Sequence, residues 1–205
     1  MRDSEGFDQW ADKYDEHVRE GEREGGYPFA GYGEVRERVF RRVTAKKNAD
    51  VLDLGFGTGT LTARLYDAGC RVFGQDFSPK MHEAAAAKMP GAGLYVGDLT
   101  QGLVEPLKEH EYDFIIATYS LHHLTDPQKV ALLRQLRSLL REGGAILVGD
   151  VSFATAAERE ACRLAAGEEW DEDEHYIAAD ELRAELPELK FERVSPCAGI
   201  TTIEK

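Results

Sequence analysis

The sequence predicts an α/β fold with a doubly wound, mostly parallel sheet of seven strands that ends in a C-terminal antiparallel hairpin. Apolar, strand-like runs alternate with helical patterns five times between residues 50 and 153, and such alternation is typical of a parallel sheet. A glycine-spaced turn follows the first run, and two further β-like runs lie at the end of the chain. Five parallel strands and the hairpin together make the expected seven.

The region before the sheet, residues 1–33, is expected to form a lid helix and a gating loop. Four residues mark one apolar helical face by their spacing: Phe7, Trp10, Ala11 and Tyr14. This helix covers either the core alone or a bound ligand. The glycine-rich end of the region also carries a proline and three aromatic residues, a composition that favours a mobile loop beside a ligand pocket.

The first strand, near residues 50–54, leads into a loop with glycine at every second position: Gly55, Gly57 and Gly59. Glycine adopts positive φ angles and lets a ligand approach the backbone closely. The helix after the loop directs free N–H groups and the positive end of its dipole toward it. The G-x-G-x-G spacing differs from the G-x-G-x-x-G of dinucleotide-binding proteins. The loop either binds a nucleotide-like ligand, which we favour, or is a glycine-rich turn without one.

An aspartate, Asp76, ends the second strand at residues 70–76 and lies 17 residues beyond Gly59. A carboxylate at this place in an α/β sheet accepts hydrogen bonds from two ribose hydroxyls. Asp76 could instead begin the next helix. Because Ser78 and Pro79 already match the N-cap and the first position of that helix, we expect Asp76 to be free for a ligand.

A second aspartate, Asp98, ends the third strand at residues 94–98. It either accepts a hydrogen bond from an adenine amino group or forms a turn before Leu99 and Thr100. Ligand sites of open α/β sheets lie at the carboxyl ends of the strands, so both aspartates are candidates for one site.

Two histidines, His122 and His123, follow the most apolar strand, residues 112–120, at the same carboxyl edge. They are the candidates for a general base. Adjacent residues do not share a face, so we expect at most one to point inward. Alternatively, one packs against the helix that begins at Asp126 and the other is solvated. Other pocket candidates carry aromatic or imidazole groups: Tyr14, Tyr119, His175 and Tyr176.

The C-terminal third is predicted to complete the sheet. The helix that begins at Asp126 is expected to end at residues 142–144, before a fifth strand at 145–153. Helical patterns and an acidic stretch follow. The last two β-like runs are joined by a turn near Ala198-Gly199, which predicts a hairpin at the sheet edge.

The composition indicates one α/β domain, residues 1–205, with a small-molecule partner. A net charge of -13 and a pI near 4.9 argue against nucleic acid, because phosphate backbones repel such a surface. No run approaches a membrane span, and the N-terminus lacks a secretion signal. We therefore expect a cytoplasmic protein, monomer or homodimer, without a membrane partner. Three separated cysteines argue against disulfides and a metal site: Cys70, Cys162 and Cys197.

Four motifs resemble those of class I S-adenosylmethionine-dependent methyltransferases, in the same order and with similar separations. They read VLDLGFGTGTL, VFGQDFSPKM, YVGDL and ATYSLHHLTD. The resemblance covers most of residues 7–150, and the terminal hairpin resembles the antiparallel strand that this family inserts in its sheet. A closer likeness, carried by FDQWADKYDEHV, FAGYGEV and TYSLHHLTDPQK, is to small bacillus-type methyltransferases of unassigned substrate.

The resemblance implies that S-adenosyl-L-methionine contacts residues at successive strand ends. The methionine portion would lie against the glycine loop and the end of the fourth strand: Gly55, Gly57, Gly59, Thr118 and Tyr119. The ribose and adenine would contact the ends of the second and third strands: Asp76 at the ribose hydroxyls, Phe77 on the adenine ring, and Asp98 and Leu99 at the adenine edge. Asp53 would organise the loop from beneath, and Tyr14 would close over the site.

The resemblance also implies a Rossmann-like domain in three parts: a lid and gating loop at 1–33, a cofactor-binding core at 34–153, and substrate-side helices with the hairpin at 154–205. The implied reaction is methyl transfer to a small molecule by in-line displacement. Orientation contributes most to such a step, and a base is needed only where the acceptor must lose a proton. Two classes stay open: a catalytically silent binding module, and a nicotinamide-dependent oxidoreductase, which the glycine spacing disfavours.

Overall fold

The computed structural model of the chain describes residues 26–205. The strands are β1 Asp50–Leu54, β2 Arg71–Asp76, β3 Gly93–Val96, β4 Tyr112–Thr118, β5 Leu140–Phe153, β6 Ile177–Ala178, β7 Lys190–Arg193 and β8 Ala198–Glu204. The α-helices are α2 Tyr32–Thr44, α3 Thr60–Asp67, α4 Pro79–Lys88, α5 Glu105–Lys108, α6 Asp126–Ser138, α7 Ala156–Ala166 and α8 Ala179–Arg183. Short 3₁₀ turns are η1 Leu99–Gln101, η2 Leu121–His123 and η3 Gly167–Glu169.

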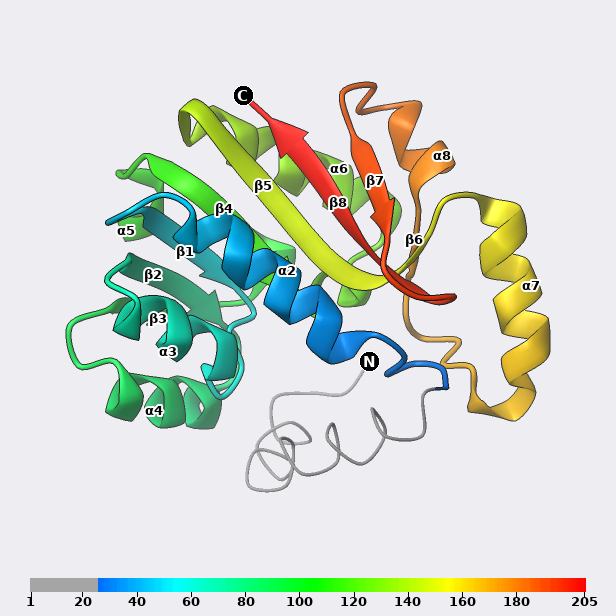
Figure 1. Cartoon of the computed structure of the whole chain (residues 1–205), viewed down its shortest axis with the longest axis horizontal. Coiled ribbons are helices and arrows are strands. Elements are labelled where there is room, and N and C mark those ends of the chain that lie inside the picture. The colour runs from blue at the N-terminus through cyan, green and yellow to red at the C-terminus, as the bar shows by residue number, and fades with distance from the viewer. Residues whose placement is uncertain (1–25) are drawn as a thin grey trace.

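These strands form one mixed sheet with helices on both faces (Figure 1). The strand order is β3-β2-β1-β4-β5-β8-β7, and the two-residue strand β6 pairs with β5 off this path. Strands β3, β2, β1, β4 and β5 run parallel, whereas β8 is antiparallel to β5 and β7. The predicted fold class is confirmed, with β6 as a further short strand beyond the expected seven.

The sheet separates two hydrophobic cores because side chains alternate between its faces. In β1, Leu52 and Leu54 contact the core that α6 and α8 cover, whereas Val51 contacts the core under α2 and α3. Figure 1 shows α2 in front of the sheet and α6 behind it. Every β1 residue is buried, so the strand that carries the glycine loop lies at the rigid centre of the molecule.

Local capping signals start two helices at the site edge. Ser78 accepts a hydrogen bond from the Met81 amide at 3.2 Å, and Pro79 is the first residue of α4, as predicted. Thr125 and Gln128 form a capping box at the start of α6. Caps of this kind stabilise a helix by about 0.5–2 kcal/mol. Helix α4 therefore begins directly after the turn that follows β2, and α6 begins shortly after η2, which carries His122 and His123.

The boundary between α6 and β5 differs from the prediction. The helix ends at Ser138, so residues 142–144 do not terminate it but lie inside β5, where the register with β4 shifts just before Phe114. Gly143 has a φ of 72° there, which is the left-handed backbone that glycine supplies in a β-bulge. The Gly-Gly pair was misassigned because glycine marks helix ends and bulges alike.

The C-terminal hairpin is present, but its turn lies earlier than predicted. Residues 194–197 form the turn, and Ala198 and Gly199 are already part of β8. The Ser195 hydroxyl accepts hydrogen bonds from the amides of Cys197 and Ala198 at 3.3 and 3.0 Å, and this local bonding sets the turn. Strand β8 lies between β5 and β7, which places β7 at the edge.

The predicted lid helix and Tyr14 lie outside the described residues. Within residues 26–205, no helix is long and apolar enough to cross a membrane. The three thiols are unpaired, as predicted: Cys70, Cys162 and Cys197.

Candidate cofactor and acceptor site

The loop between β1 and α3 leaves one side of its backbone open. Gly55, Gly57 and Gly59 have φ angles of 72°, 55° and 76°, in the left-handed region that favours glycine. A Cβ at Gly55 would lie 2.4 Å from Ser120 Cβ, whereas a Cβ at Gly57 would meet no described atom within 4 Å. A ligand can therefore approach the backbone at Gly57.

The carboxylate of Asp76 is joined to this loop. Its Oδ2 accepts from the Gly57 amide at 2.8 Å, and its Oδ1 accepts from the Ser78 amide at 2.9 Å. Ser78 caps α4, as expected, so Asp76 is not the helix cap, but the turn after β2 brings both amides onto its carboxylate. Each oxygen keeps a second lone pair that can accept from a hydroxyl. Burial raises the pKa of Asp76, and the amide bonds offset part of this shift.

Asp53 lies beneath the loop and is buried. Its Oδ2 accepts a hydrogen bond from Thr62 Oγ1 at 2.6 Å, which joins β1 to α3. Burial, with a contribution from the charge of Asp76, raises the pKa of Asp53 to about 7, although the Thr62 hydrogen bond acts in the opposite direction. The Asp53–Thr62 bond therefore holds together the two elements that flank the glycine loop.

Beyond β3, Asp98 is exposed and begins the turn η1. Its Oδ1 accepts from the Thr100 amide at 2.8 Å, so the predicted turn geometry is present. Phe77 and Leu99 are half-buried. Because β2 and β3 are paired neighbours, these side chains follow adjacent strand ends at the same edge as Asp76.

At the end of β4, Tyr119 adopts an uncommon backbone. Its φ is 52°, its amide donates to the Gly149 carbonyl at 2.8 Å, and its ring centroid lies 4.4 Å from that of Tyr32. A non-glycine residue in the left-handed region is uncommon and is found preferentially at functional sites. Thr118 precedes it and is half-buried. The chain turns sharply here and enters η2.

His122 is buried on η2 and held by a carboxylate from the next strand. Its Nδ1 lies 2.7 Å from Asp150 Oδ1, and its Nε2 lies 3.7 Å from Glu174 Oε1. Burial lowers the pKa of His122, but the charges of Asp150 and Glu174 raise it to a net value above the ordinary one. A carboxylate on Nδ1 fixes the ring orientation and leaves Nε2 for chemistry.

His123 joins the same cluster. Its ring lies edge-on to that of His122, with centroids 4.3 Å apart, and it is half-buried. Burial, together with the charge of His122, lowers the pKa of His123 to about 4. Only His122 is buried, in line with the prediction that at most one histidine points inward, but the tight turn η2 brings both rings together instead of placing them on opposite faces of a strand.

The segment that carries Glu174 is fixed beside η2. The His175 amide donates to the His122 carbonyl at 2.7 Å. The ammonium of Lys129, whose side chain is fully buried, donates to the His175 carbonyl at 2.5 Å and to Asp126 Oδ1 at 2.9 Å. Because both the amide and the carbonyl of His175 are bonded, the backbone next to Glu174 is fixed, and Glu174 is held beside η2.

Three aromatic residues close the side of this cluster: Tyr27, Trp170 and Tyr176. Tyr27 stacks on Trp170 with ring centroids 5.1 Å apart, and its hydroxyl lies 2.6 Å from that of Tyr176. The Asp171 amide also bonds to the Tyr27 hydroxyl, at 3.2 Å. This aromatic latch joins the segment before α2 to the acidic stretch before β6.

Three residues of this cluster were not predicted from the sequence: Asp150, Glu174 and Trp170. Tyr27 belongs to the aromatic loop that was predicted to gate the pocket. Asp150 carried a usable signal, because it lies near the carboxyl end of a buried strand, as Asp76 does. Glu174 carried none, because it is one of several acids in a polar stretch.

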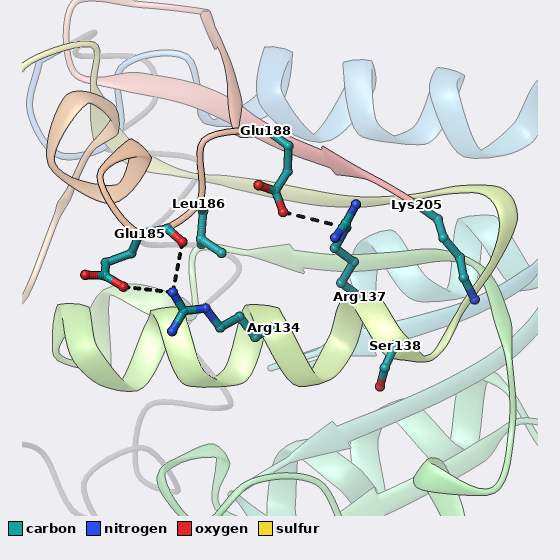
Figure 2. Close-up of a pocket in the computed structure, with 7 residues that line it drawn as sticks. All are labelled: Arg134, Arg137, Ser138, Glu185, Leu186, Glu188 and Lys205. Carbon is teal, nitrogen blue, oxygen red and sulfur yellow. Dashed lines mark hydrogen bonds and ion pairs between the residues drawn. The ribbon is translucent and has the colours of Figure 1, made fainter.

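A groove of about 450 Å³ lies at the opposite edge of the sheet (Figure 2). Its lining comes from α6, the loop before β7 and the end of β8: Arg134, Arg137, Ser138, Glu185, Leu186, Glu188 and Lys205. Arg134 is paired with Glu185 at 2.8 Å. The Lys205 amide bonds to the Gly144 carbonyl, where the parallel part of β5 begins, so the groove is separate from the candidate site.

The fold and the glycine loop define a Rossmann-like protein of the nucleotide-cofactor class. A model described as a methyltransferase domain matches residues 51–144. An uncharacterized methyltransferase of Geobacillus kaustophilus (strain HTA426) is 35% identical over 175 residues, which cover 85% of this chain and 77% of that protein. The uncharacterized methyltransferase YrrT of Bacillus subtilis (strain 168) is 34% identical over 185 residues, covering 86% and 84%. The chain belongs to this methyltransferase family.

Solved structures with bound S-adenosylhomocysteine share the fold. Magnesium protoporphyrin IX methyltransferase ChlM from Synechocystis PCC 6803, solved with bound S-adenosylhomocysteine, aligns with a TM-score of 0.66 at 21% identity and covers 86% of this chain and 85% of its own. The DhpI–S-adenosylhomocysteine complex aligns with a TM-score of 0.69 at 18% identity and covers 97% and 93%. At these identities, the likeness confirms the Rossmann-like fold.

Proposed function

We propose that the protein transfers a methyl group from S-adenosylmethionine to a small-molecule acceptor. The observation that carries the proposal is the glycine loop. Its backbone is open to a ligand at Gly57, and the Gly57 amide donates to the carboxylate of Asp76 at the carboxyl edge of the sheet. Membership of the methyltransferase family supports the reaction class. ChlM and DhpI, which share the fold, were each solved with S-adenosylhomocysteine, the form of the cofactor that remains after methyl transfer.

The cofactor fits the residues at the strand ends. Its methionine portion would lie along the glycine loop and the end of β4: Gly55, Gly57, Gly59, Thr118 and Tyr119. Asp76 would accept from the ribose hydroxyls with its remaining lone pairs. Asp53 would keep the loop in shape through Thr62. The adenine would contact the neighbouring strand ends: Phe77, Asp98 and Leu99.

The residues of the chain act mainly by orientation. When bound, the cofactor supplies an already activated methyl group, so holding the acceptor in line and excluding water can contribute roughly 7–11 kcal/mol. Where the acceptor must lose a proton, Nε2 of His122 would accept it, because Nδ1 is engaged by Asp150. His123 and Tyr14 are the other groups proposed on the acceptor side.

The aromatic latch and the acidic net charge of the chain favour a small acceptor. The aromatic latch covers the side of the cluster at His122, and the net charge of -13 repels nucleic acid. Free thiols are typical of a reducing compartment, so we propose a cytoplasmic protein. We propose a monomer or homodimer, which light scattering of the purified chain would test.

The proposal is tested with S-adenosylmethionine that carries a labelled methyl group, in a protein-free small-molecule extract and in a matched macromolecular fraction. Label should enter the small-molecule fraction only, and Asp76→Asn should reduce the rate. Transfer to protein or nucleic acid would contradict a small-molecule acceptor. Binding of S-adenosylhomocysteine without transfer to either fraction would favour a silent binding module, and thermal stabilisation by NAD instead would favour an oxidoreductase.

A further inference from the structure

A cluster of three potential metal ligands lies at the acceptor side of the site. One ring nitrogen from each of His122 and His123 and one carboxylate oxygen of Glu174 lie within 4.8 Å of one another. Nε2 of His122 is 3.7 Å from Glu174 Oε1. We infer that these three side chains form a binding site for a divalent cation of the zinc class.

The size of the cluster suits such an ion. Zinc bonds of 2.0–2.2 Å to nitrogen and oxygen in tetrahedral geometry place the ligand atoms about 3.3 Å apart. The cluster must therefore contract by on the order of 1 Å to reach this spacing, which side-chain rotation can supply, since His123 and Glu174 are only half-buried. Their partial exposure also provides an entry path for the ion.

The surroundings of His122 match those of a metal ligand. Metal-bound histidines almost always donate their second ring N–H to a carboxylate or carbonyl, which fixes the ring and directs the other nitrogen to the metal. Asp150 stands in that position, with its Oδ1 2.7 Å from Nδ1 of His122. Asp150 is itself buried and held by the Val151 amide at 2.8 Å. The outer carboxylate is thus already in place.

The third ligand is positioned without an ion. His175 bonds to the His122 carbonyl through its amide, and to Lys129 through its own carbonyl, so Glu174 is held beside η2 by the backbone next to it. Among the described residues, the carboxylates of Asp150 and Glu174 lie next to His122, and the neighbouring ammonium of Lys129 is itself paired with Asp126. The local charge therefore favours a cation.

The donor set selects the class of ion. Two imidazoles and a carboxylate suit zinc and its first-row neighbours, whereas calcium and magnesium require oxygen ligands. Three protein ligands leave a fourth position open, as catalytic zinc sites do. An ion on Nε2 would occupy the lone pair proposed above for the proton of the acceptor, so zinc is expected to slow the transfer; that consequence, unlike the binding, rests on the proposed function.

The test is zinc binding by the tag-free, full-length chain, measured by dialysis with metal analysis and by calorimetry with zinc chloride. One zinc per chain is expected. His123→Ala and Glu174→Gln should each weaken binding more than tenfold, and Asp150→Asn by roughly 10–100-fold. Cobalt in place of zinc should give the visible absorption of a tetrahedral site.

Matched controls remove the same groups elsewhere: His110→Ala, whose ring lies against Phe73, and Glu172→Gln, which is paired with Arg163. Both should keep the affinity of the unaltered chain. Circular dichroism shows whether each variant is folded. Absence of stoichiometric zinc, or unchanged affinity in either His123→Ala or Glu174→Gln, would overturn the inference. Since no cofactor or acceptor is present, failure here leaves the methyl-transfer proposal to its own test.

Discussion

The amide of Gly57 donates a hydrogen bond to Asp76 Oδ2 at 2.8 Å, so the glycine loop and the end of β2 behave as one structural unit. The residue proposed to bind the ribose thus also shapes the loop proposed to bind the methionine portion. A substitution at either position acts on both stability and cofactor affinity, and the two effects must be measured separately.

Asp76→Asn is expected to lower both quantities. The side-chain amide of asparagine has one acceptor oxygen, so one of the two backbone N–H groups that donate to Asp76 would lose its partner. This loss should lower the free energy of unfolding by about 1–3 kcal/mol. Affinity for S-adenosylhomocysteine should fall at least about tenfold, because bonds to a charged group contribute about 1.5–3 kcal/mol. Chemical denaturation and calorimetry measure the two effects. Asp67→Asn, at an exposed position, is the control, and unchanged affinity in Asp76→Asn would refute the ribose assignment.

Two alanine substitutions separate the structural glycine from the ligand-facing one. At Gly55, a Cβ would lie 2.4 Å from Ser120 Cβ, so Gly55→Ala should destabilise the fold by more than the roughly 1–2 kcal/mol of left-handed backbone alone. At Gly57, no described atom meets the new Cβ, so Gly57→Ala should cost only that backbone energy.

The same pair tests the open side of the loop. Gly57→Ala should lose cofactor affinity out of proportion to its small loss of stability, because its Cβ projects where the cofactor would lie. Thermal melts with and without S-adenosylhomocysteine measure both effects. Full ligand stabilisation of Gly57→Ala would mean that the cofactor does not approach this face.

Acid should weaken the fold at the amino-terminal edge of the sheet. Burial raises the pKa of Asp50 and of Asp113, but ion pairs with basic side chains lower both to net values below the ordinary range. Arg141 contacts both carboxylates. A carboxyl whose folded pKa is depressed stabilises the protein above its unfolded pKa of about 3.9, and this stability is lost as the pH falls through the folded pKa.

Arg141→Gln should therefore reduce stability at neutral pH and flatten the loss of stability between about pH 5 and the folded pKa values. Urea denaturation as a function of pH measures this. Arg134→Gln, whose partner Glu185 is more than half exposed, is the control, because exposed pairs contribute little. Parallel pH curves for Arg141→Gln and the unaltered chain would contradict the role of these carboxylates.

Tyr27→Phe is expected to loosen the aromatic latch. The change removes the hydroxyl that bonds to Tyr176 and Asp171 but keeps the ring stacked on Trp170. With a net loss of about 0.5–1.5 kcal/mol for each of the two hydrogen bonds, local opening should be roughly 5- to 160-fold faster. Hydrogen exchange of the amides before β6 measures it. Tyr95→Phe on β3 provides the comparison and should leave this segment unchanged; equal exchange in both variants would show that the latch does not hold it.

Local signals in the sequence determined the fold class and one half of the candidate site. The alternation of strands and helices, the positive-φ glycines after β1 and the Ser78 cap each act within a few residues, so they are readable without the rest of the chain. Asp76 was predictable for the same reason, since it ends a strand. The helix end before β5 was not, because Gly143 serves a bulge that exists only when β4 is beside it.

Tertiary structure decided the other half of the candidate site. Asp150 reaches His122 because β4 and β5 are neighbours in the sheet, and Glu174 reaches it because Lys129 and His175 fix a segment from far along the chain. These contacts depend on the order of the strands in the sheet and on the hydrogen bonds that the buried Lys129 ammonium donates. No local sequence pattern encodes either of them. The sequence alone therefore determined a strand–loop–helix unit suited to a nucleotide cofactor, whereas packing of distant elements assembled the polar cluster at His122.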